Sequence, residues 1–263
     1  MIQALYTAAS GMLAQQMSID TISNNLANVS TTGFKKMRVD FQDLLYHTIK
    51  PAGGAPTAPG IQSPVPIQVG EGVRPISTPR IFSQGEVVTT ENPLDLMVEG
   101  DGFFSVLQPD GTIGYTRDGS WKRDSLGRVV NSDGLPMEPE ITIPPEATRI
   151  SIARTGEVAV YMPGSSNAEM VGQIELTRFL NPAGLQASGR NILTTSDASG
   201  EAMQGTPGLE GFGTVAQGFL EQSNVKVVEE LVNMIIAQRA YEINSRAVQT
   251  SDDMLQAASN MKR

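Results

Sequence analysis

The stretch VVEELVNMIIAQRAYEINSRAVQTSDDML, residues 227–255, repeats an apolar side chain every seven positions. A sustained seven-residue repeat is typical of a helix that lays one apolar stripe along a second helix. The repeating residues are Val227, Met234, Tyr241, Val248 and Leu255, with Leu231 one turn after the first of them. The stretch therefore predicts a long C-terminal helix, from about residue 222 to residue 260, that packs against another helix.

The N-terminus carries a matching pattern, which predicts a helix over residues 3–29. Leu5, Met12, Ile19 and Leu26 lie at steps of seven, and a parallel set that contains Ile22 is offset by three. Because such patterns stand at both ends of a long insertion, we expect the two ends to meet and to carry assembly. The expected interface consists of Leu5, Met12, Ile19, Ile22, Leu26, Val227, Leu231, Met234, Tyr241, Val248 and Leu255.

The charge distribution separates the ends from the middle of the chain. The formal net charge is −9, and residues 51–216 hold 19 of the 28 acids but only 10 of the 19 bases. Within residues 1–34 the only charged residue is Asp20. An ordinary exposed helix face carries Lys and Glu, so this uncharged face favours a helix that packs on several sides. A helix buried in one large domain is the alternative.

Composition limits the chemistry that the chain can perform. It has no cysteine and one histidine, His47, which excludes disulfides, thiolate zinc sites and imidazole clusters. The acidic pI near 4.7 argues against a nucleic-acid partner. No stretch approaches the roughly 20 apolar residues of a membrane span, and the first basic residue, Lys35, comes too late for a cleaved secretory signal. We expect no cofactor, and a chain that is either cytoplasmic or exported with its N-terminus uncleaved.

Residues 51–79 hold seven of the sixteen prolines. Proline fixes φ and lacks an amide donor, so the run PAGGAPTAPG at residues 51–60 predicts neither a helix nor a central strand. We expect an extended segment over residues 47–83. Five of its prolines are interpreted as stiffening residues: Pro51, Pro56, Pro59, Pro64 and Pro66. A floppy tether is the alternative, because Gly53 and Gly54 lie in the same run.

From about Gln84 the apolar period changes to two, which is typical of strands. Tight-turn sequences such as Pro109-Asp110-Gly111 separate the apolar runs. The expected strands cover residues 94–98, 103–107, 113–116, 120–123, 128–131, 141–143, 149–153, 157–162 and 172–177. The predicted fold class is α+β, with paired N- and C-terminal coiled-coil helices and an inserted antiparallel β-rich body of short strands. The expected domains are 1–46 with 217–263 as a helical axial core, 47–83 as the extended segment and 84–216 as a β-rich outer domain.

Several short sequences resemble enzyme or metal motifs, but simpler interpretations suffice. The glycine-rich stretch 208–213 lacks a preceding strand and a Lys-Ser/Thr pair, so it is interpreted as a turn. Asp118, Asp124 and Asp133 are spaced too widely for a calcium loop. Nothing in the sequence assembles a nucleophile, a base and an orienting group. We therefore expect no catalytic residue, no metal ligand and no enzymatic activity.

Both ends and part of the middle also resemble a known family. The sequences ALYTAASGM (4–12), NNLAN (24–28) and TGFK (32–35) are similar to the N-terminal signature of the bacterial flagellar rod and hook proteins. EGDGFF (99–104), YTRDG (115–119), EQSNV (221–225) and residues 229–245 match later parts of that pattern. The resemblance covers essentially the whole chain. Length and the sequence DLLYHTI (43–49) make it greatest for the distal rod branch of the family.

The resemblance implies a structural subunit that self-assembles into a rigid tubular drive shaft and transmits torque to the hook. Implied partners are proximal rod proteins, the hook protein, bushing ring proteins in the peptidoglycan and outer membrane, and the type III export apparatus. The implied location is the periplasm-spanning rod of the basal body. Arg239, Glu242 and Arg246 are candidates for ion pairs between subunits or for a solvated helix face. The alternatives are another axial protein of the family, or an unrelated secreted β-rich polysaccharide-binding protein, against which the single Trp121 argues.

Overall fold

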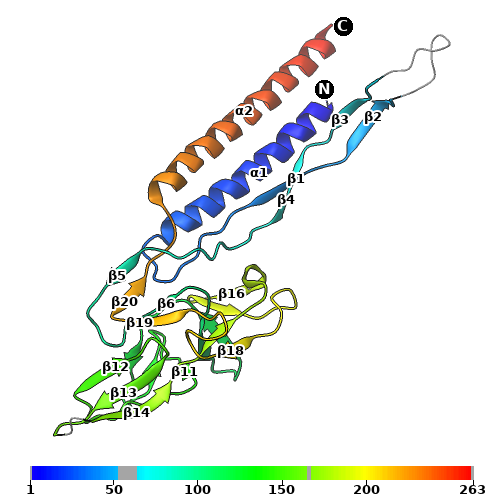
Figure 1. Cartoon of the computed structure of the whole chain (residues 1–263). Helices are drawn as coiled ribbons and strands as arrows, with labels where there is room; N and C mark the ends of the chain where they lie inside the picture. The colour runs from blue at the N-terminus through cyan, green and yellow to red at the C-terminus, as the bar shows by residue number, and fades with distance from the viewer. Residues whose placement is uncertain (1, 53–63, 165–166, 262–263) are drawn as a thin grey trace. The chain divides into compact units, whose positions relative to one another are not determined.

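The computed structural model describes residues 2–52, 64–164 and 167–261 of the chain, which contain two long helices and many short strands (Figure 1). The chain divides into two compact units. The helical unit comprises Met1–Leu26, Met37–Pro79 and Val227–Arg263, and the β-rich unit comprises Ala27–Lys36 and Arg80–Lys226. This division differs from the expected domains, because residues 27–36 join the β-rich unit and most of the proline-rich segment joins the helices.

Both expected helices are present in the helical unit. α1 spans Ile2–Ala27 and α2 spans Val227–Asn260, and they lie side by side with the two chain ends at the same end of the pair (Figure 1). α2 begins at Val227 rather than near residue 222, and residues 222–226 form an irregular connection between the strand Phe219–Glu221 and the helix. Glu229 and Glu230 lie in the first turn of α2, where negative charge stabilises the helix dipole. Neither described helix is long and apolar enough to cross a membrane.

The helical unit also contains two antiparallel ribbons. β1 (Asp40–Asp43) pairs with β4 (Val73–Ser77), and β2 (Tyr46–Lys50) pairs with β3 (Ile67–Gly70). Within residues 47–83, which were expected to be extended, the structure thus places β3, β4 and most of β2 in paired strands. Ladder pairing forms there because β-branched residues flank the proline run, and Pro75 is tolerated because each strand of a two-stranded ribbon has an unpaired edge. Residues 53–63 lie outside the described part of the chain.

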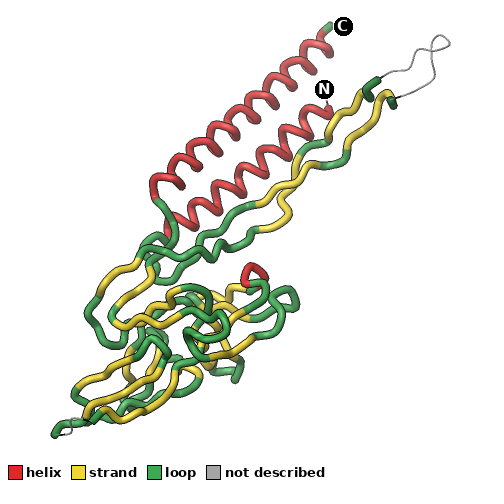
Figure 2. The backbone as a smooth tube through the Cα atoms, viewed as in Figure 1, coloured by secondary structure: helices red, strands yellow, loops and turns green. Residues whose placement is uncertain are grey.

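The β-rich unit consists of short strands joined by loops and turns (Figure 2). Its largest sheet has the order β11-β7-β8-β17-β16, and a second sheet has the order β12-β13-β14; all pairings are antiparallel. Four two-stranded pairs, β19–β6, β20–β5, β15–β18 and β10–β9, complete the unit. A short 3₁₀ helix, η1, spans Pro182–Gly184.

The strands of the β-rich unit have the following bounds: β5 Val87–Thr89, β6 Leu96–Glu99, β7 Phe104–Leu107, β8 Ile113–Thr116, β9 Lys122–Arg123, β10 Val129–Val130, β11 Met137–Glu138, β12 Arg149–Ile152, β13 Glu157–Tyr161, β14 Ala168–Gln173, β15 Leu176–Arg178, β16 Gln186–Gly189, β17 Ile192–Thr194, β18 Met203–Gly205, β19 Thr214–Gln217 and β20 Phe219–Glu221. The expected run 141–143 forms no strand; its Thr142 only bridges to Arg128.

The core of the β-rich unit is mostly aliphatic, with one aromatic pair at its centre. Phe104 and Trp121 are fully buried, and their rings meet edge to face with centroids 5.5 Å apart. Around them pack Leu96, Val98, Val106, Met137, Ile141, Ile143, Val158, Val160, Ile174, Leu176 and other apolar residues. A second cluster of Phe103, Tyr115, Phe179, Leu185 and Leu193 lies beside it. Val, Ile and Leu therefore supply most of the core, as the low aromatic content predicts.

Candidate assembly surface and ionic junction

α1 and α2 contact each other through small and polar side chains. A Cβ atom added at Gly11 would lie 2.9 Å from Nδ2 of Asn244, and Nδ2 of Asn25 donates to Oε2 of Glu230 across 3.5 Å. Residue numbers along the contact therefore increase in α1, from Gly11 to Asn25, as they decrease in α2, from Asn244 to Glu230. The two helices run antiparallel. Two contacts of this kind do not make a continuous knobs-into-holes seam, and coiled-coil packing stays a prediction.

The predicted interface residues differ widely in exposure. Ile22 is buried, and the half-buried members are Leu5, Met12, Ile19, Leu26, Met234, Val248 and Leu255. The exposed members are Val227, Leu231 and Tyr241. The buried residues of α2 are instead Glu230, Ala237 and Ser251, three positions after members of the apolar stripe. The seven-residue spacing is present in the helix, but its most buried face carries small and polar residues.

α2 also exposes large apolar side chains that the seven-residue pattern did not single out. Between 51% and 74% of the surface of each remains accessible in Val228, Val232, Ile235, Ile236, Ile243 and Met254. On α1, Tyr6 and Leu13 are exposed as well. Exposed apolar side chains gathered on one element indicate an interaction surface. The signal was available in the nearly continuous apolar run 231–236, which surrounds the helix rather than following one stripe.

The charged residues proposed for α2 make a local contact. Nη1 of Arg239 lies 2.8 Å from Oε2 of Glu242 one turn along the same helix, and both side chains are more than half exposed. An exposed pair of this kind contributes about 0–1 kcal/mol. Arg246 is exposed further along the helix. The Arg239–Glu242 pair is therefore a contact within one helix, and a role of these residues between subunits stays a prediction.

Polar groups of α1 hold the neighbouring chain in place within the helical unit. The buried amide of Asn25 pairs with the backbone of Met37, donating to its carbonyl at 2.8 Å and accepting from its N–H at 2.9 Å. Oγ of Ser10 accepts from the N–H of Val73 at 3.3 Å. A Cβ atom at Gly72 would overlap this serine, so glycine is required where β4 approaches α1.

The interpreted stiffening prolines lie at or beyond the ends of β2 and β3. Pro51, Pro64 and Pro66 are exposed, whereas Pro56 and Pro59 lie outside the described residues. The β2–β3 ribbon leaves Ile49 and Ile67 exposed, and Leu45 precedes it with 81% of its surface accessible. A two-stranded ribbon is marginally stable by itself in water. Its apolar side chains therefore make it a second candidate contact surface, and the stiffening role stays a prediction.

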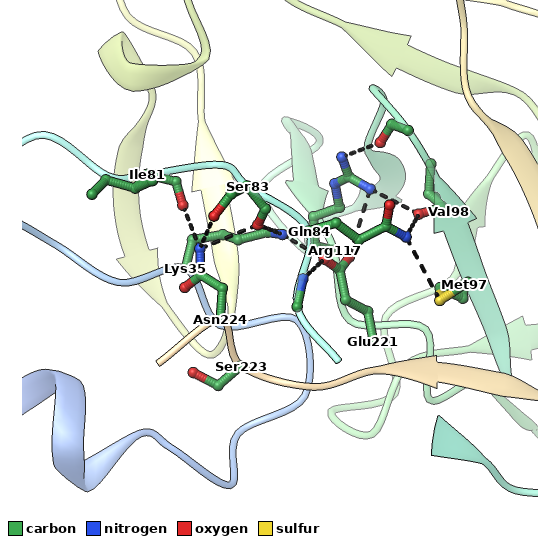
Figure 3. A network of polar contacts seen from close by, with 12 residues as sticks. Lys35, Ile81, Ser83, Gln84, Met97, Val98, Arg117, Glu221, Ser223 and Asn224 are labelled. Carbon is green, nitrogen blue, oxygen red and sulfur yellow. Dashed lines mark hydrogen bonds and ion pairs between the residues drawn. The ribbon is translucent and has the colours of Figure 1, made fainter. Parts of the chain in front are cut away.

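The β-rich unit contains a buried ionic junction of three side chains, shown in Figure 3. Nζ of Lys35 lies 2.5 Å from Oε1 of Glu221, and Nη1 of Arg117 lies 3.6 Å from Oε2 of the same carboxylate. The exposed fractions of the three side chains are 3% for Lys35, 5% for Arg117 and 1% for Glu221. Lys35 and Glu221 come from opposite ends of the chain, and Arg117 follows β8. The junction thus ties the segment after α1 to the strand that precedes α2.

Hydrogen bonds from the surrounding backbone also reach these charges, whereas Nε of Arg117 and Oε2 of Glu221 make none within the described residues. Arg117 donates to the carbonyls of Val98 at 3.2 Å and Gly100 at 2.6 Å, and its guanidinium lies 5.4 Å from the Phe103 ring centroid. Lys35 donates to the Ser83 carbonyl at 2.8 Å, and the Gly85 N–H donates to Glu221 at 2.9 Å. Each charge therefore has several polar partners, which buried charges need.

Burial dominates the electrostatics of the junction. Burial lowers the pKa of the Lys35 ammonium; Glu221 acts in the opposite direction, and the nearby Arg117 cation lowers that pKa further. Burial also lowers the pKa of the Arg117 guanidinium, against the opposing effect of Glu221. The desolvation cost thus outweighs the attraction in both cations, as is common for buried ion pairs. The junction is therefore better explained by specificity of docking than by a gain in stability.

Neutral contacts reinforce the same junction. The Asn224 side chain accepts from the Lys36 N–H at 2.8 Å and donates to the Ile81 carbonyl at 2.7 Å. The Gly33 N–H donates to the Glu221 carbonyl at 2.8 Å. Gly33 has a φ of +67°, and an added Cβ would lie 2.5 Å from the Arg117 carbonyl carbon. Residues 33–36 are therefore held by the body and by residues 221–224 together.

Four of the sequence motifs that carried the family resemblance meet at this junction. TGFK supplies Lys35, YTRDG supplies Arg117, EQSNV supplies Glu221 and Asn224, and EGDGFF supplies the Gly100 carbonyl and Phe103. Reasoning from the sequence did not assign these residues to a site. The available signal was the presence of charged residues inside otherwise apolar or small-residue motifs, but only the fold shows that they are paired.

Family models match three parts of the chain. Residues 5–35 match the flagella basal body rod protein family, residues 97–160 match the flagellar hook protein FlgE/F/G D1 domain, and residues 216–261 match the flagellar basal body rod FlgEFG protein C-terminal family. The first and last matches cover the two helices, and the middle match covers much of the β-rich unit. Of the three charged residues of the ionic junction, Lys35 lies in the first match, Arg117 in the second and Glu221 in the third.

Full-length relatives give the same result. The chain is 51% identical to the flagellar basal-body rod protein FlgG of Borreliella burgdorferi, over all of both chains. It is 46% identical to FlgG of Caulobacter vibrioides, over 99% of this chain and 100% of that protein. It is 39% identical to FlgG of Bacillus subtilis, again over all of both chains.

The hook protein is a more partial relative. The chain is 41% identical to the flagellar hook protein FlgE of Helicobacter pylori over 52% of this chain, but only 19% of that protein is covered. The full-length matches therefore separate the rod from the hook. The chain is a structural protein of the flagellar basal body rather than an enzyme, and it belongs to the FlgG family of flagellar rod proteins.

Proposed function

We propose that the apolar faces of α1 and α2 join copies of this chain into the rigid tubular shaft of the distal rod, which transmits torque to the hook. The observation that carries the proposal is the set of six large apolar side chains that α2 leaves exposed: Val228, Val232, Ile235, Ile236, Ile243 and Met254. The heptad residues Val227, Leu231 and Tyr241 extend the same surface. In a polymer, neighbouring subunits would cover these side chains.

The energetics require contacts on more than one side of each subunit. Burying one Val, Leu or Ile side chain contributes about 1.5–3 kcal/mol, so six of them supply roughly 10 kcal/mol. Association itself costs about 4–15 kcal/mol. The free energy gained by burying one helix face is thus about equal to the cost of association. Contacts through both helices and the β2–β3 ribbon together favour association. This balance suits a subunit that joins only a growing polymer.

The β-rich unit would form the outer layer of the shaft. Most of the net negative charge lies in residues 51–216, which keeps a surface soluble. The axial partners in this proposal are proximal rod proteins and the hook protein. Around the shaft lie the bushing rings of the peptidoglycan and outer membrane. The subunit would cross the periplasm as part of the rod after type III export without signal cleavage.

A charge on the exposed face of α2 tests the proposal. Ile236→Glu places a carboxylate on the proposed interface, and we expect tubes to be lost from electron micrographs of concentrated protein. Circular dichroism of the monomer should stay unchanged, because Ile236 is 61% exposed in the single subunit. Asp110→Lys, at an exposed turn of the β-rich unit, is the control and should assemble normally. Tubes formed equally by both variants would contradict the proposal.

A further inference from the structure

The ionic junction buries two cations and one anion, and the exposed carboxylate of Asp101 also acts on Arg117 from the surface. Lys35 and Arg117 both contact Glu221, and the two cations also repel each other. Without Lys35, a neutral Arg117–Glu221 pair remains. Without Glu221, two buried positive charges face each other with no buried counter-charge, only the solvent-exposed Asp101 near Arg117, which is the more costly arrangement. The three residues are therefore unequal, and Glu221 is the one on which docking of the others depends.

The three residues also come from different parts of the chain. Lys35 lies in residues 27–36, Arg117 lies in the body, and Glu221 ends β20. In the neutral contacts, as in the Lys35–Glu221 pair, residues 33–36 donate and residues 221–224 accept. The Gly33 N–H donates to the Glu221 carbonyl, and the Lys36 N–H donates to the Asn224 side chain. The docked position of residues 33–36 is thus completed by residues 221–224.

We propose that Lys35, Arg117 and Glu221 form a charge lock that lets residues 33–36 dock on the rest of the β-rich unit only after β20 has placed Glu221. Before that, docking would bring the Lys35 ammonium into a buried site already occupied by the Arg117 guanidinium. After it, the carboxylate accepts a hydrogen bond from Lys35 and forms an ion pair with Arg117. Glu221 acts as a positioning residue for the N-terminal segment.

The lock couples the two ends of the subunit. Residues 27–36 follow α1 directly in the chain, and residues 219–226 precede α2 directly. The segment after α1 would therefore dock only when the strand before α2 is in place. A chain with only one end ordered would keep its N-terminal segment undocked. The benefit to assembly, that incomplete subunits do not add to the polymer, rests on the proposed function; the lock itself rests on the contacts alone.

Hydrogen exchange on the full-length monomer tests the lock. The reporter amides are Gly33, Lys36 and Ile81, whose N–H groups donate to Glu221, Asn224 and Lys36 respectively. Peptides covering β7 and β8 report whether the body is folded. The variants are Glu221→Gln, Lys35→Met and the double variant, and Glu86→Gln, an exposed glutamate of the same unit, is the matched control.

Glu221→Gln should speed exchange of the reporter amides by about tenfold to a hundredfold, because it leaves two unpaired buried cations. Lys35→Met should change the exchange rate of the reporter amides by less than about threefold, since the remaining Arg117–Glu221 pair has no net charge. The double variant should regain most of the protection that Glu221→Gln loses, because it removes one of the repelling cations.

Equal effects of Glu221→Gln and Lys35→Met would overturn the lock, since a merely structural ion pair loses the same contact either way. So would a double variant that exchanges as fast as Glu221→Gln. If Glu221→Gln unfolds the body as well, recovery of β7 and β8 protection in the double variant still supports the lock, and failure to recover overturns it. Tube formation plays no part in this measurement, so the lock and the proposed function can fail independently.

Discussion

At Gly33, a residue of the junction, any side chain would strain the backbone. Its φ lies in the left-handed region, and an added Cβ would collide with the Arg117 backbone. Gly33→Ala combines left-handed strain of about 1–2 kcal/mol with that collision, so we expect the β-rich unit to lose more than this from its free energy of unfolding. Urea unfolding followed by Trp121 fluorescence measures the loss. Ser30→Ala, an exposed change in the same segment, should stay within about 0.5 kcal/mol; similar losses in both variants would contradict the close approach.

Asp124 gives the β-rich unit a contribution to stability that depends on pH. The Arg128 side chain, 2.9 Å away, lowers the pKa of the Asp124 carboxyl, and hydrogen bonds from Ser125 add to the effect. A carboxyl with a lowered pKa stabilises the fold above its ordinary value near 3.8 and loses that contribution as pH falls through the lower folded value.

We therefore expect Asp124→Asn to flatten the acid side of the stability profile. The measurement is the urea midpoint at a series of pH values from about 5 down to about 2. Glu210→Gln, a surface carboxylate of the same unit, is the control. A profile for Asp124→Asn as steep as that of the unaltered chain would show that the Arg128 contact does not act in solution.

At the scale of elements, Asn25 is the point where α1 holds the chain that returns from the β-rich unit. Asn25→Leu would leave the N–H and the carbonyl of Met37 without their amide partner, which costs about 1–3 kcal/mol for each buried group. We expect the Met37 amide to exchange with solvent at least tenfold faster, while α1 itself remains helical by circular dichroism. Ser23→Ala, on an exposed position of the same helix, should leave Met37 unchanged. An unaltered Met37 amide in Asn25→Leu would mean that other contacts hold this segment.

At the scale of the whole molecule, the proline-rich segment is expected to decide whether a polymer is straight or curved. Deleting residues 52–64 would preserve β2 and β3 and shorten only the connection between them. If the segment lies between neighbouring subunits and resists sliding, the variant should still assemble but form curved tubes in micrographs. Replacing the same residues by a Gly/Ser linker of equal length separates stiffness from length, because such linkers are flexible coils. Straight tubes from both variants would leave the segment a spacer.

Sequence reasoning succeeded where periodic burial repeats along the chain. The two helices and the hairpins around Phe104, Ile113 and Val158 were predicted, because apolar side chains recur there with the period of the element. It missed β16, all of whose four residues are exposed, and β20, which ends just before the helix expected from about residue 222. Strands so short carry too few residues to show a period, and they exist because a neighbouring strand supplies their ladder partners.

The sequence by itself determined the class of elements, the position of the helices at both ends and the family, because each is encoded in local periodicity or in contiguous motifs. Only the tertiary structure decided which residues those motifs bring together. Lys35, Arg117 and Glu221 look like ordinary surface charges in the sequence, yet the fold buries all three in one junction. The antiparallel contact of Gly11 with Asn244 was hidden for the same reason. Pairing across such sequence separations depends on how the chain folds back, and no local pattern records it.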